Sequence, residues 1–372
     1  MQAHHTALPH VKGRGSGLNL QGRFEAEQRL GFDDGWDIAE ELKTPRKTVI
    51  RIEPVKSTLV FNQSPDLGFD RSINTYRGCE HGCIYCYARP NHSYIGLSPG
   101  LDFETQIFAK QDAAAVLRKE LAKPGYVCAP VNIGSSTDAY QPADRELAIT
   151  RQVLEVLDQV NHPLSIVTKS WLVERDIDIL SRMAKRNLVA IYISVTTLDP
   201  ELSRKMEPRA AAPWRRLETI RRLSQAGIPV SVSLAPVIPF INEPEIEKIL
   251  LACKNAGAIG AHYVVVRLPW EVKTLFRDWL QEHFPDRASR VMHRIQDMRG
   301  GKDNDSNFVS RMKGEGIWAD LIRMRFQSTA KHLGMWRQRI PLDTHQFNAQ
   351  ELRTQFDLAK KREANHGQTE LF

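Results

Sequence analysis

Short apolar, β-branched segments alternate in the middle of this chain with longer segments of helical periodicity. Because strands that alternate with helices pair in parallel through right-handed crossovers, this order predicts an α/β fold. A unit of about 30–40 residues favours a barrel or partial barrel, in which chemistry takes place at the carboxyl ends of the strands. The predicted strands are Val127–Gly134, Leu164–Thr168, Val189–Val195, Val230–Ala235 and His262–Val266. The predicted helices cover 104–122, 144–159, 173–186, 213–226, 243–256 and 270–283.

The segments on either side of this pattern are different. Thr48–Glu53 alternates and predicts a short strand, whereas the Gly-rich, basic stretch His10–Gly17 predicts a mobile segment. After residue 285 the rhythm stops, a helix is predicted over 315–334, and the polar tail from 352 is expected to fray. We therefore expect a flexible N-terminal segment over 1–45, a core barrel over 46–285 and a mainly helical extension over 286–372.

Composition excludes several protein classes. Hydrophobic residues make up 42% of the chain and charged residues 26%, which excludes a fibrous or wholly disordered protein. The sequence contains no apolar run of about 18 residues, so no transmembrane helix is predicted. Met1–His5 is not followed by the apolar core of a secretory signal, so we expect a cytoplasmic protein that does not bind a membrane.

Charge leaves two interpretations open. The net charge is +7, and 19 of the 51 basic residues but only 14 of the 44 acidic residues lie after residue 261. Such an excess permits binding to nucleic acid without requiring it, and a solvated basic surface is the favoured interpretation. Tryptophans 270, 279, 318 and 336 in this region are interpreted as core residues, with base stacking as the alternative.

Three of the five cysteines lie close together in the segment Gly78–Tyr87. Cys79, Cys83 and Cys86 have the spacing C-x3-C-x2-C, and thiolates are the natural ligands of iron–sulfur clusters. Three thiolates hold three irons of a cubane cluster and leave the fourth open, as a catalytic metal site requires. The alternative is a structural zinc site closed by a fourth ligand, for which His92 is better placed than His81.

The cysteine spacing, with the aromatic Tyr85 before the third cysteine, resembles the signature of radical S-adenosylmethionine (SAM) enzymes. The resemblance implies a partial (β/α)6 barrel, a 4Fe-4S cluster on the three cysteines, and SAM chelated to the open iron. It also implies that one electron cleaves SAM into methionine and a 5′-deoxyadenosyl radical, which abstracts hydrogen from a substrate. A reductant such as a flavodoxin or ferredoxin is then an expected partner, and Tyr85 is expected beside the adenine.

Polar segments at the strand ends are similar to those of the spore photoproduct lyase-like subgroup. Ser136–Pro142, Val167–Ser170, Ile193–Thr196 and Ala235–Pro239 each end or follow a predicted strand. Spore photoproduct lyase uses a cysteine near its active site, whereas Gly134–Ser136 contains none here. Repair of thymine photoproducts is therefore not carried over. Cys128 is expected to be buried at the opposite end of its strand, and Cys253 is expected to pack within a helix.

Within this resemblance, several residues are candidates for SAM binding. Lys169 is expected to pair with the SAM carboxylate, and Ser194 to bind the ribose or the amino acid part. Thr137 and Asp138 contact SAM or substrate, or else cap helices. Arg209 either clamps a carboxylate or phosphate or pairs with an acid of its loop.

Two classes of function remain open at this stage. The first is a radical SAM enzyme with an unidentified substrate, for which nucleic acid or a nucleotide is favoured over a protein or peptide. The second is a non-catalytic zinc or iron–sulfur scaffold that binds nucleic acid.

Overall fold

The computed structural model describes residues 13–25, 47–338 and 340–369. Its main element is a seven-stranded sheet in the order β10-β9-β8-β7-β6-β3-β2. All neighbouring strands in it are parallel except β2, which runs antiparallel to β3. The strands are β2 (Leu59–Phe61), β3 (Arg71–Ile73), β6 (Val131–Ile133), β7 (Leu164–Thr168), β8 (Val189–Ser194), β9 (Val230–Val237) and β10 (Gly260–Val265).

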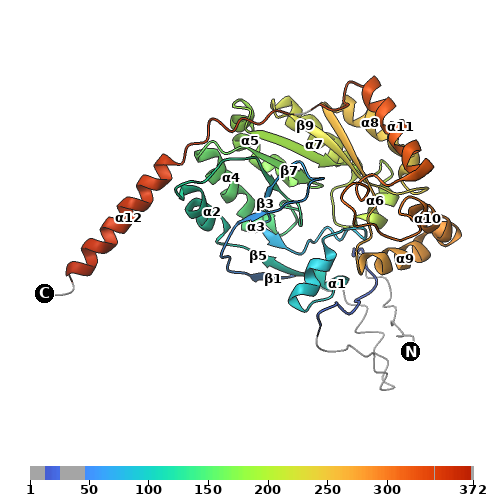
Figure 1. Ribbon diagram of the computed structural model, residues 1–372, viewed down its shortest axis with the longest axis horizontal. Helices are drawn as coiled ribbons and strands as arrows, with labels where there is room; N and C mark the ends of the chain where they lie inside the picture. The colour runs from blue at the N-terminus through green and yellow to red at the C-terminus, as the bar shows by residue number, and fades with distance from the viewer. Residues whose placement is uncertain (1–12, 26–46, 339, 370–372) are drawn as a thin grey trace, which may run out of the picture.

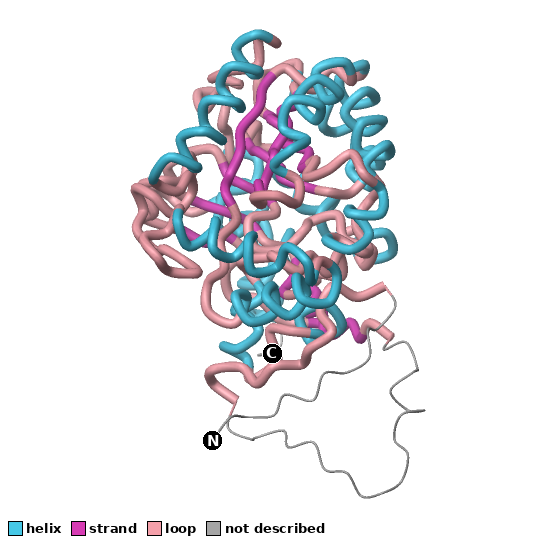
Figure 2. The backbone as a smooth tube through the Cα atoms, turned by 90° about the vertical axis from the view of Figure 1, so that its right-hand side faces the viewer, coloured by secondary structure: helices cyan, strands magenta, loops and turns pink. Residues whose placement is uncertain are grey.

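Helices cover the outer face of this sheet, so the parallel strands form a partial barrel (Figures 1 and 2). This confirms the predicted α/β fold. The covering helices are α2 (Ala113–Ala122), α4 (Ile149–Gln159), α5 (Ile177–Ala184), α7 (Pro213–Gln225) and α8 (Ile246–Asn255). Two short helices, α3 (Asp144–Leu147) and α6 (Pro200–Met206), lie in the loops that follow β6 and β8.

The apolar residues that predicted the strands form the core between sheet and helices. Ile133, Ile166, Ile191 and Val232, one from each of four adjacent strands, are fully buried. Each such side chain stabilises the fold by about 1.5–3 kcal/mol through its removal from water. The core therefore fixes the strands, and the polar residues that follow them are brought to one edge of the sheet.

A second, three-stranded sheet contradicts the helix predicted over 104–122. The chain there forms α1 (Leu101–Thr105), then β5 (Gln106–Ala109), and only then α2. β5 pairs in parallel with β1 (Val49–Ile52) and antiparallel with β4 (Tyr76–Arg77). The predicted strand at Thr48–Glu53 is thus confirmed, and its partner is the segment that the periodicity assigned to a helix.

The strand expected over 127–134 is shorter than predicted, because only Val131–Ile133 pairs with its neighbours. Cys128 lies outside that strand and is half-buried, so its predicted place as a buried strand residue is wrong. Cys253 is fully buried on α8, as expected.

The C-terminal region is helical, with α9 (Val272–His283), α10 (Pro285–Asp297), α11 (Gly316–His332) and α12 (Gln350–Thr369). α12 replaces the frayed tail that its polarity predicted, and it extends away from the body of the molecule (Figure 1). Leu352, which is fully buried, anchors its first turn. In the described part of the chain, no helix is both long and apolar enough to cross a membrane.

Residues 13–25 are the described part of the segment predicted to be flexible. They contain no helix or strand, but Arg14, Ser16, Leu18 and Leu20 are buried. The rest of residues 1–45, apart from 13–25, lies outside the described residues, and the three domain boundaries stay a prediction.

Candidate active site

The loop Gly78–Tyr87 carries the three cysteines and joins β4 to the short helix η2 (Arg89–Ile95). Gly78 and Gly82 have φ values of +80° and +67°, which glycine adopts without steric cost. A Cβ at Gly82 would lie 2.6 Å from Oε2 of Glu104. Glycine at both positions therefore lets the loop fold tightly.

Arg89 holds this loop through its backbone carbonyls. Its guanidinium is fully buried and donates to the carbonyl oxygens of Cys83 at 2.9 Å and Gly82 at 3.0 Å. It also pairs with Glu104 at 2.5 Å, and Glu104 accepts a hydrogen bond from the backbone N–H of Gly15 at 2.9 Å. The loop is thus fixed by a buried ion pair and by the N-terminal segment.

All three cysteines line one cavity of about 480 Å³, which we call the thiol cavity. The polar residues that follow the strands line it from the other side, because the carboxyl ends of parallel strands meet at one edge of the sheet. The predicted site residues in its lining are Cys79, Tyr85, Cys83, Cys86, Thr137, Asp138, Lys169 and Ser194.

The cysteines share one electrostatic environment. Burial, against the opposing effect of Lys169 and together with Glu207 and Cys86, raises the pKa of the Cys83 thiol to about 12. Burial, together with Asp138 and the other two thiols, likewise raises the pKa of Cys79. A bound metal stabilises the thiolate form directly and reverses this preference. Three mutually interacting thiols around one cavity fit a cluster with three protein ligands.

Lys169 lies at the end of β7 and brings a positive charge to this cavity. Burial acts to lower the pKa of its ammonium group, but the neighbouring Cys83 and Glu207 outweigh burial and raise it. The ammonium nitrogen lies 5.8 Å from the ring centroid of Tyr85. Lys169 therefore brings a charged ammonium group into the lining of the cavity that the thiols share.

A buried network that the sequence analysis missed supports Tyr85. Glu207 accepts hydrogen bonds from the hydroxyl of Tyr85, from Oγ1 of Thr196 at 2.9 Å, and from the guanidinium of Arg216. Arg216 also donates to the carbonyl of Ser194 at 3.1 Å. Burial acts to raise the pKa of Glu207, but Arg216 and Lys169 outweigh it and lower the pKa. Arg216 lies on the amphipathic helix α7, where nothing in the sequence distinguishes it from solvent-exposed arginines.

Asp138 and Thr137 are bound to the protein around them. Asp138 accepts a hydrogen bond from the backbone N–H of Lys169 at 2.8 Å and pairs with His81 at 3.3 Å. Burial acts to raise the pKa of Asp138, but His81 and the hydrogen bonds to the carboxylate outweigh it and lower the pKa. Thr137 donates to the carbonyl oxygen of Gly78 at 2.6 Å. Both residues therefore hold the cysteine loop and the end of β7 in place.

Arg209 is not brought to the thiol cavity. Its guanidinium lies 3.1 Å from Oε1 of Glu80 and donates to Oγ1 of Thr48 at 3.1 Å. The structure shows the second interpretation, a pair with a carboxylate, but that carboxylate, Glu80, belongs to the cysteine loop and not to the loop of Arg209.

The closed zinc site is not formed by the side chains that the structure describes. Nε2 of His92 lies 3.0 Å from the carbonyl oxygen of Gln106, and His92 is not part of the cavity lining. His81 lines the cavity but pairs with Asp138. Within residues 13–25, 47–338 and 340–369, no group of three or more His, Cys, Asp or Glu side chains is placed to hold a single metal ion.

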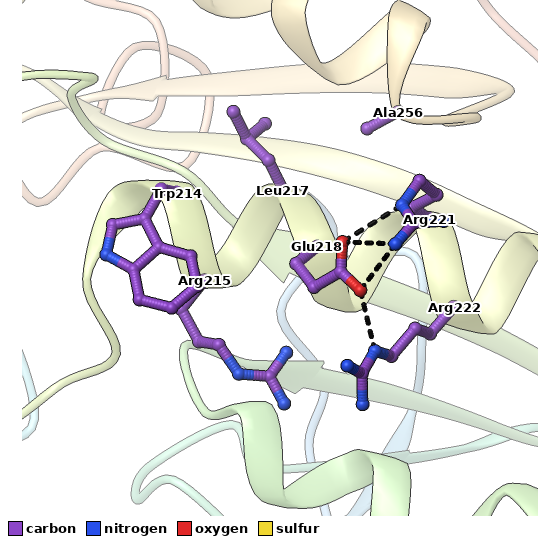
Figure 3. Close-up of a pocket in the computed structure, with 7 residues that line it drawn as sticks. All are labelled: Trp214, Arg215, Leu217, Glu218, Arg221, Arg222 and Ala256. Carbon is purple, nitrogen blue, oxygen red and sulfur yellow. Dashed lines mark hydrogen bonds and ion pairs between the residues drawn. The ribbon is translucent and has the colours of Figure 1, made fainter.

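A separate hollow lies on α7, away from every predicted site residue (Figure 3). Trp214, Leu217, Glu218 and Ala256 contribute to its lining. Its arginines already have carboxylate partners, since Glu218 pairs with Arg221 and Arg222, and Glu174 pairs with Arg215 and Arg222. This hollow therefore offers a ligand no unpaired arginine.

Comparison with known proteins identifies the family. Residues 73–253 match the family model described as the radical SAM superfamily. The uncharacterized protein Rv2578c of Mycobacterium tuberculosis is 33% identical over 274 residues, which cover 72% of this chain and 79% of the relative. The chain belongs to the radical SAM superfamily. The uncharacterized protein MJ0683 of Methanocaldococcus jannaschii is 24% identical over 240 residues, covering 64% of this radical SAM enzyme and 85% of the relative.

The fold of this radical SAM enzyme also resembles a solved structure of spore photoproduct lyase with bound AdoMet and dinucleoside spore photoproduct. The TM-score is 0.54 with 16% identity, covering 83% of this chain and 86% of the other. At this identity the comparison shows a shared fold. Superfamily membership implies SAM and a 4Fe-4S cluster as cofactors, and the three cysteines around the thiol cavity are a donor set that fits such a cluster.

Proposed function

We propose that Cys79, Cys83 and Cys86 hold a 4Fe-4S cluster in the thiol cavity and that SAM binds beside it. When bound, such a cluster supplies one electron, which splits SAM into methionine and a 5′-deoxyadenosyl radical able to remove a hydrogen atom from a substrate. One observation supports this proposal most directly: three thiols of one loop and the residues at the carboxyl ends of the strands line the same cavity.

The chain's own residues then bind and orient SAM. The ammonium group of Lys169, which stays charged between its negative neighbours, pairs with the SAM carboxylate. The hydroxyl of Ser194 bonds the ribose or the amino acid part, and the ring of Tyr85, fixed through Glu207, forms the wall beside the adenine. Asp138 and Thr137 act as positioning residues, because their side chains already bind the protein.

We propose a nucleotide or nucleic acid as the substrate class. The basic excess of the C-terminal third supports it, as does the fold shared with an enzyme solved with a dinucleoside photoproduct. Among the described residues that line the thiol cavity, the cysteines are the three proposed cluster ligands. A further thiol for returning hydrogen to a thymine product is thus lacking there, so the reaction differs from photoproduct repair. A flavodoxin or ferredoxin is the proposed reductant.

Anaerobic reconstitution tests the function. With iron, sulfide and a chemical reductant, the protein is expected to bind a 4Fe-4S cluster and to release 5′-deoxyadenosine from SAM. A non-catalytic scaffold would instead contain stoichiometric zinc or an inert cluster, and no 5′-deoxyadenosine would form.

Replacing one cluster ligand gives the sharpest control. Cys83→Ala is expected to keep the circular dichroism spectrum of the fold but to lose 5′-deoxyadenosine release, because one iron lacks its ligand. Cys128→Ala, which removes a half-buried thiol outside the thiol cavity, is expected to retain release. Full SAM cleavage by Cys83→Ala would reject the assignment.

A further inference from the structure

A second cavity, of about 720 Å³, adjoins the thiol cavity at the C-terminal extension. The two share Arg267 and Arg311, which line both. We call this second cavity the basic chamber, because Arg267, Arg311, Lys273, Arg277 and Lys302 line it. A substrate that occupies both cavities would contact these cations with the part that does not react.

The loop 299–307 contributes to the lining of the basic chamber and is bound to the residues at the end of β10. Arg299 is buried and donates to the carbonyl oxygens of Val266 at 2.9 Å and Ser310 at 3.0 Å. Asn304 accepts a hydrogen bond from the backbone N–H of Leu268 at 3.2 Å. The chamber is therefore shaped in advance by contacts within the protein.

Two acidic residues of the chamber are already bound by the protein. Asp303 pairs with Arg277 at 2.7 Å and also accepts a hydrogen bond from Gln296 at 2.9 Å. Asp305 accepts hydrogen bonds from the hydroxyl of Ser310 and from the backbone N–H of Asn307. These carboxylates build the loop, and they leave part of the positive charge uncompensated.

Three cations of the chamber remain available. Within the described residues, no ion pair of 4 Å or less joins Lys273, Lys302 or Arg267 to a carboxylate, although the lysines act at longer range on Asp303 and Asp305. Arg311, in contrast, is paired with Asp66 at 2.5 Å.

Arg267 differs from the two lysines because it is half-buried and has few hydrogen-bond acceptors around it. Its guanidinium is half-buried, lies 5.0 Å from the ring centroid of Tyr87, and donates to the sulfur of Met312 at 3.4 Å. Burial lowers the pKa of Arg267. A guanidinium has five N–H donors, and a thioether sulfur is a weak acceptor for one of them. A desolvated cation with so few partners is costly unless an anion binds it.

Trp270 adds an aromatic surface to the same chamber. Its side chain is 61% exposed, which corrects its interpretation as a core residue, and Arg23 lies 4.0 Å from its ring centroid. The hollow on α7 also has an exposed tryptophan, Trp214, but its Arg221 and Arg222 are paired with Glu218 (Figure 3). An exposed indole beside unpaired cations thus distinguishes the basic chamber.

We infer that the basic chamber binds a phosphate group of the substrate while the reacting part lies in the thiol cavity. This inference rests on the proposed function and specifies how that site selects its substrate. Phosphate oxygens satisfy several guanidinium and ammonium donors at once, and an exposed aromatic ring beside them suits a nucleobase. The phosphate belongs to a free nucleotide or to a single strand.

Binding to the reconstituted protein tests the inference. The probe is a fluorescein-labelled hexamer of thymidylate, followed by fluorescence anisotropy at several salt concentrations. Reversing two charges, in Lys273→Glu with Lys302→Glu, is expected to weaken binding at least tenfold. The slope of log affinity against log salt is expected to fall by about 1.4, since each lost phosphate contact removes about 0.7 for single strands.

The matched control is Lys254→Glu with Lys331→Glu, which changes the net charge equally at exposed positions of α8 and α11. Equal loss in both double variants would overturn the inference, because net charge alone would explain it. If the reversed variant fails to fold, Lys273→Ala with Lys302→Ala replaces it.

Competition identifies the source of the phosphate. Thymidine monophosphate that competes as well as the unlabelled hexamer indicates a free nucleotide, and competition by the hexamer alone indicates a strand. Stronger competition by poly-glutamate than by either would overturn the phosphate assignment, as would absence of binding by the wild type.

The same wild-type preparation is tested for 5′-deoxyadenosine release. Cleavage without phosphate binding rejects only the chamber, whereas binding without cleavage rejects only the radical SAM function.

Discussion

Lys169 shows how neighbouring groups keep a partly buried side chain in its charged form. Its neighbours Cys83 and Glu207 raise its pKa against the effect of burial. The residue following β7 is therefore a permanent cation facing the thiol cavity. The zwitterionic amino acid part of SAM carries a carboxylate that such a cation attracts.

Removing this cation is expected to weaken SAM binding more than cluster binding. A hydrogen bond to a charged group contributes about 1.5–3 kcal/mol, so Lys169→Met is expected to raise the SAM dissociation constant about 10- to 100-fold. Equilibrium binding of SAM to the reconstituted protein measures this, with iron content as the internal check. Lys185→Met, at an exposed position after α5, is the matched control. An unchanged dissociation constant for Lys169→Met would reject the role.

The site residues that the sequence could predict are those whose position follows from strand topology. Lys169 follows β7 directly, Ser194 ends β8 and Thr137 lies in the loop after β6, and parallel strands end at one edge. Arg209 follows no strand directly, and the motif around it did not establish whether its side chain reaches the cavity. Arg267 follows the predicted strand His262–Val266 directly, so its place beside the cavity was open to the same argument, whereas Arg311 reaches the cavity only through the packing of the C-terminal extension.

At the scale of elements, the cysteine loop depends on the buried pair Arg89–Glu104. Both side chains are fully buried, and Arg89 bonds the carbonyls of Gly82 and Cys83. Loss of one partner leaves the other charge buried and uncompensated. The pair therefore couples α1 and the N-terminal segment to the loop that holds the thiols.

Arg89→Met is expected to reduce the free energy of unfolding by about 3–5 kcal/mol. Urea denaturation of the apoprotein measures this. The exposed pair provides a control, because Arg221→Met, opposite Glu218, is expected to cost less than about 1 kcal/mol. The double variant of Arg89→Met with Glu104→Gln is expected to lose less than the sum of the two single variants. Strict additivity would show that the two side chains act independently.

The elements that were predicted wrongly from the sequence include one whose hydrogen-bond partners are distant along the chain. β5 has four residues, too few to establish an alternating pattern, and its hydrogen bonds go to β1 and β4. α12 is the opposite case, because its polar sequence suggested a frayed tail although Glu, Arg, Lys, Leu and Ala favour helix. Helices α4, α7 and α8 were predicted well, since each buries one apolar stripe against the sheet.

At the scale of the whole molecule, the two ends of the barrel differ, because one contains the cavity and the other contributes to stability. The carboxyl ends of the strands form the thiol cavity, whereas the amino end of β7 is covered by side chains from distant segments. His162 precedes β7 and Lys169 follows it, so the strand separates them by about 20 Å. His162 is fully buried and contacts Tyr126 and Phe347.

The hydrogen bonds of His162 fix its neutral form. Nδ1 lies 2.9 Å from the carbonyl oxygen of Pro163, which only accepts, so Nδ1 carries the proton. Nε2, 2.8 Å from the hydroxyl of Tyr126, is then the acceptor. Burial lowers the pKa of His162 to about 4, against about 6.5 in the unfolded chain.

This difference predicts a loss of stability in acid that originates far from the site. Between about pH 6.5 and pH 4 the unfolded chain binds a proton at His162 that the folded chain does not, so the free energy of unfolding falls as pH falls. The contribution is at most about 1.4 kcal/mol per pH unit, or about 3 kcal/mol over the range. Urea denaturation at pH 7.5, 6 and 5 is expected to show a shallower pH dependence for His162→Gln than for the wild type. His345→Gln, at an exposed position, is the matched control. Parallel curves for His162→Gln and the wild type would mean that His162 binds its proton equally well in the folded and the unfolded chain, and would reject the neutral buried form.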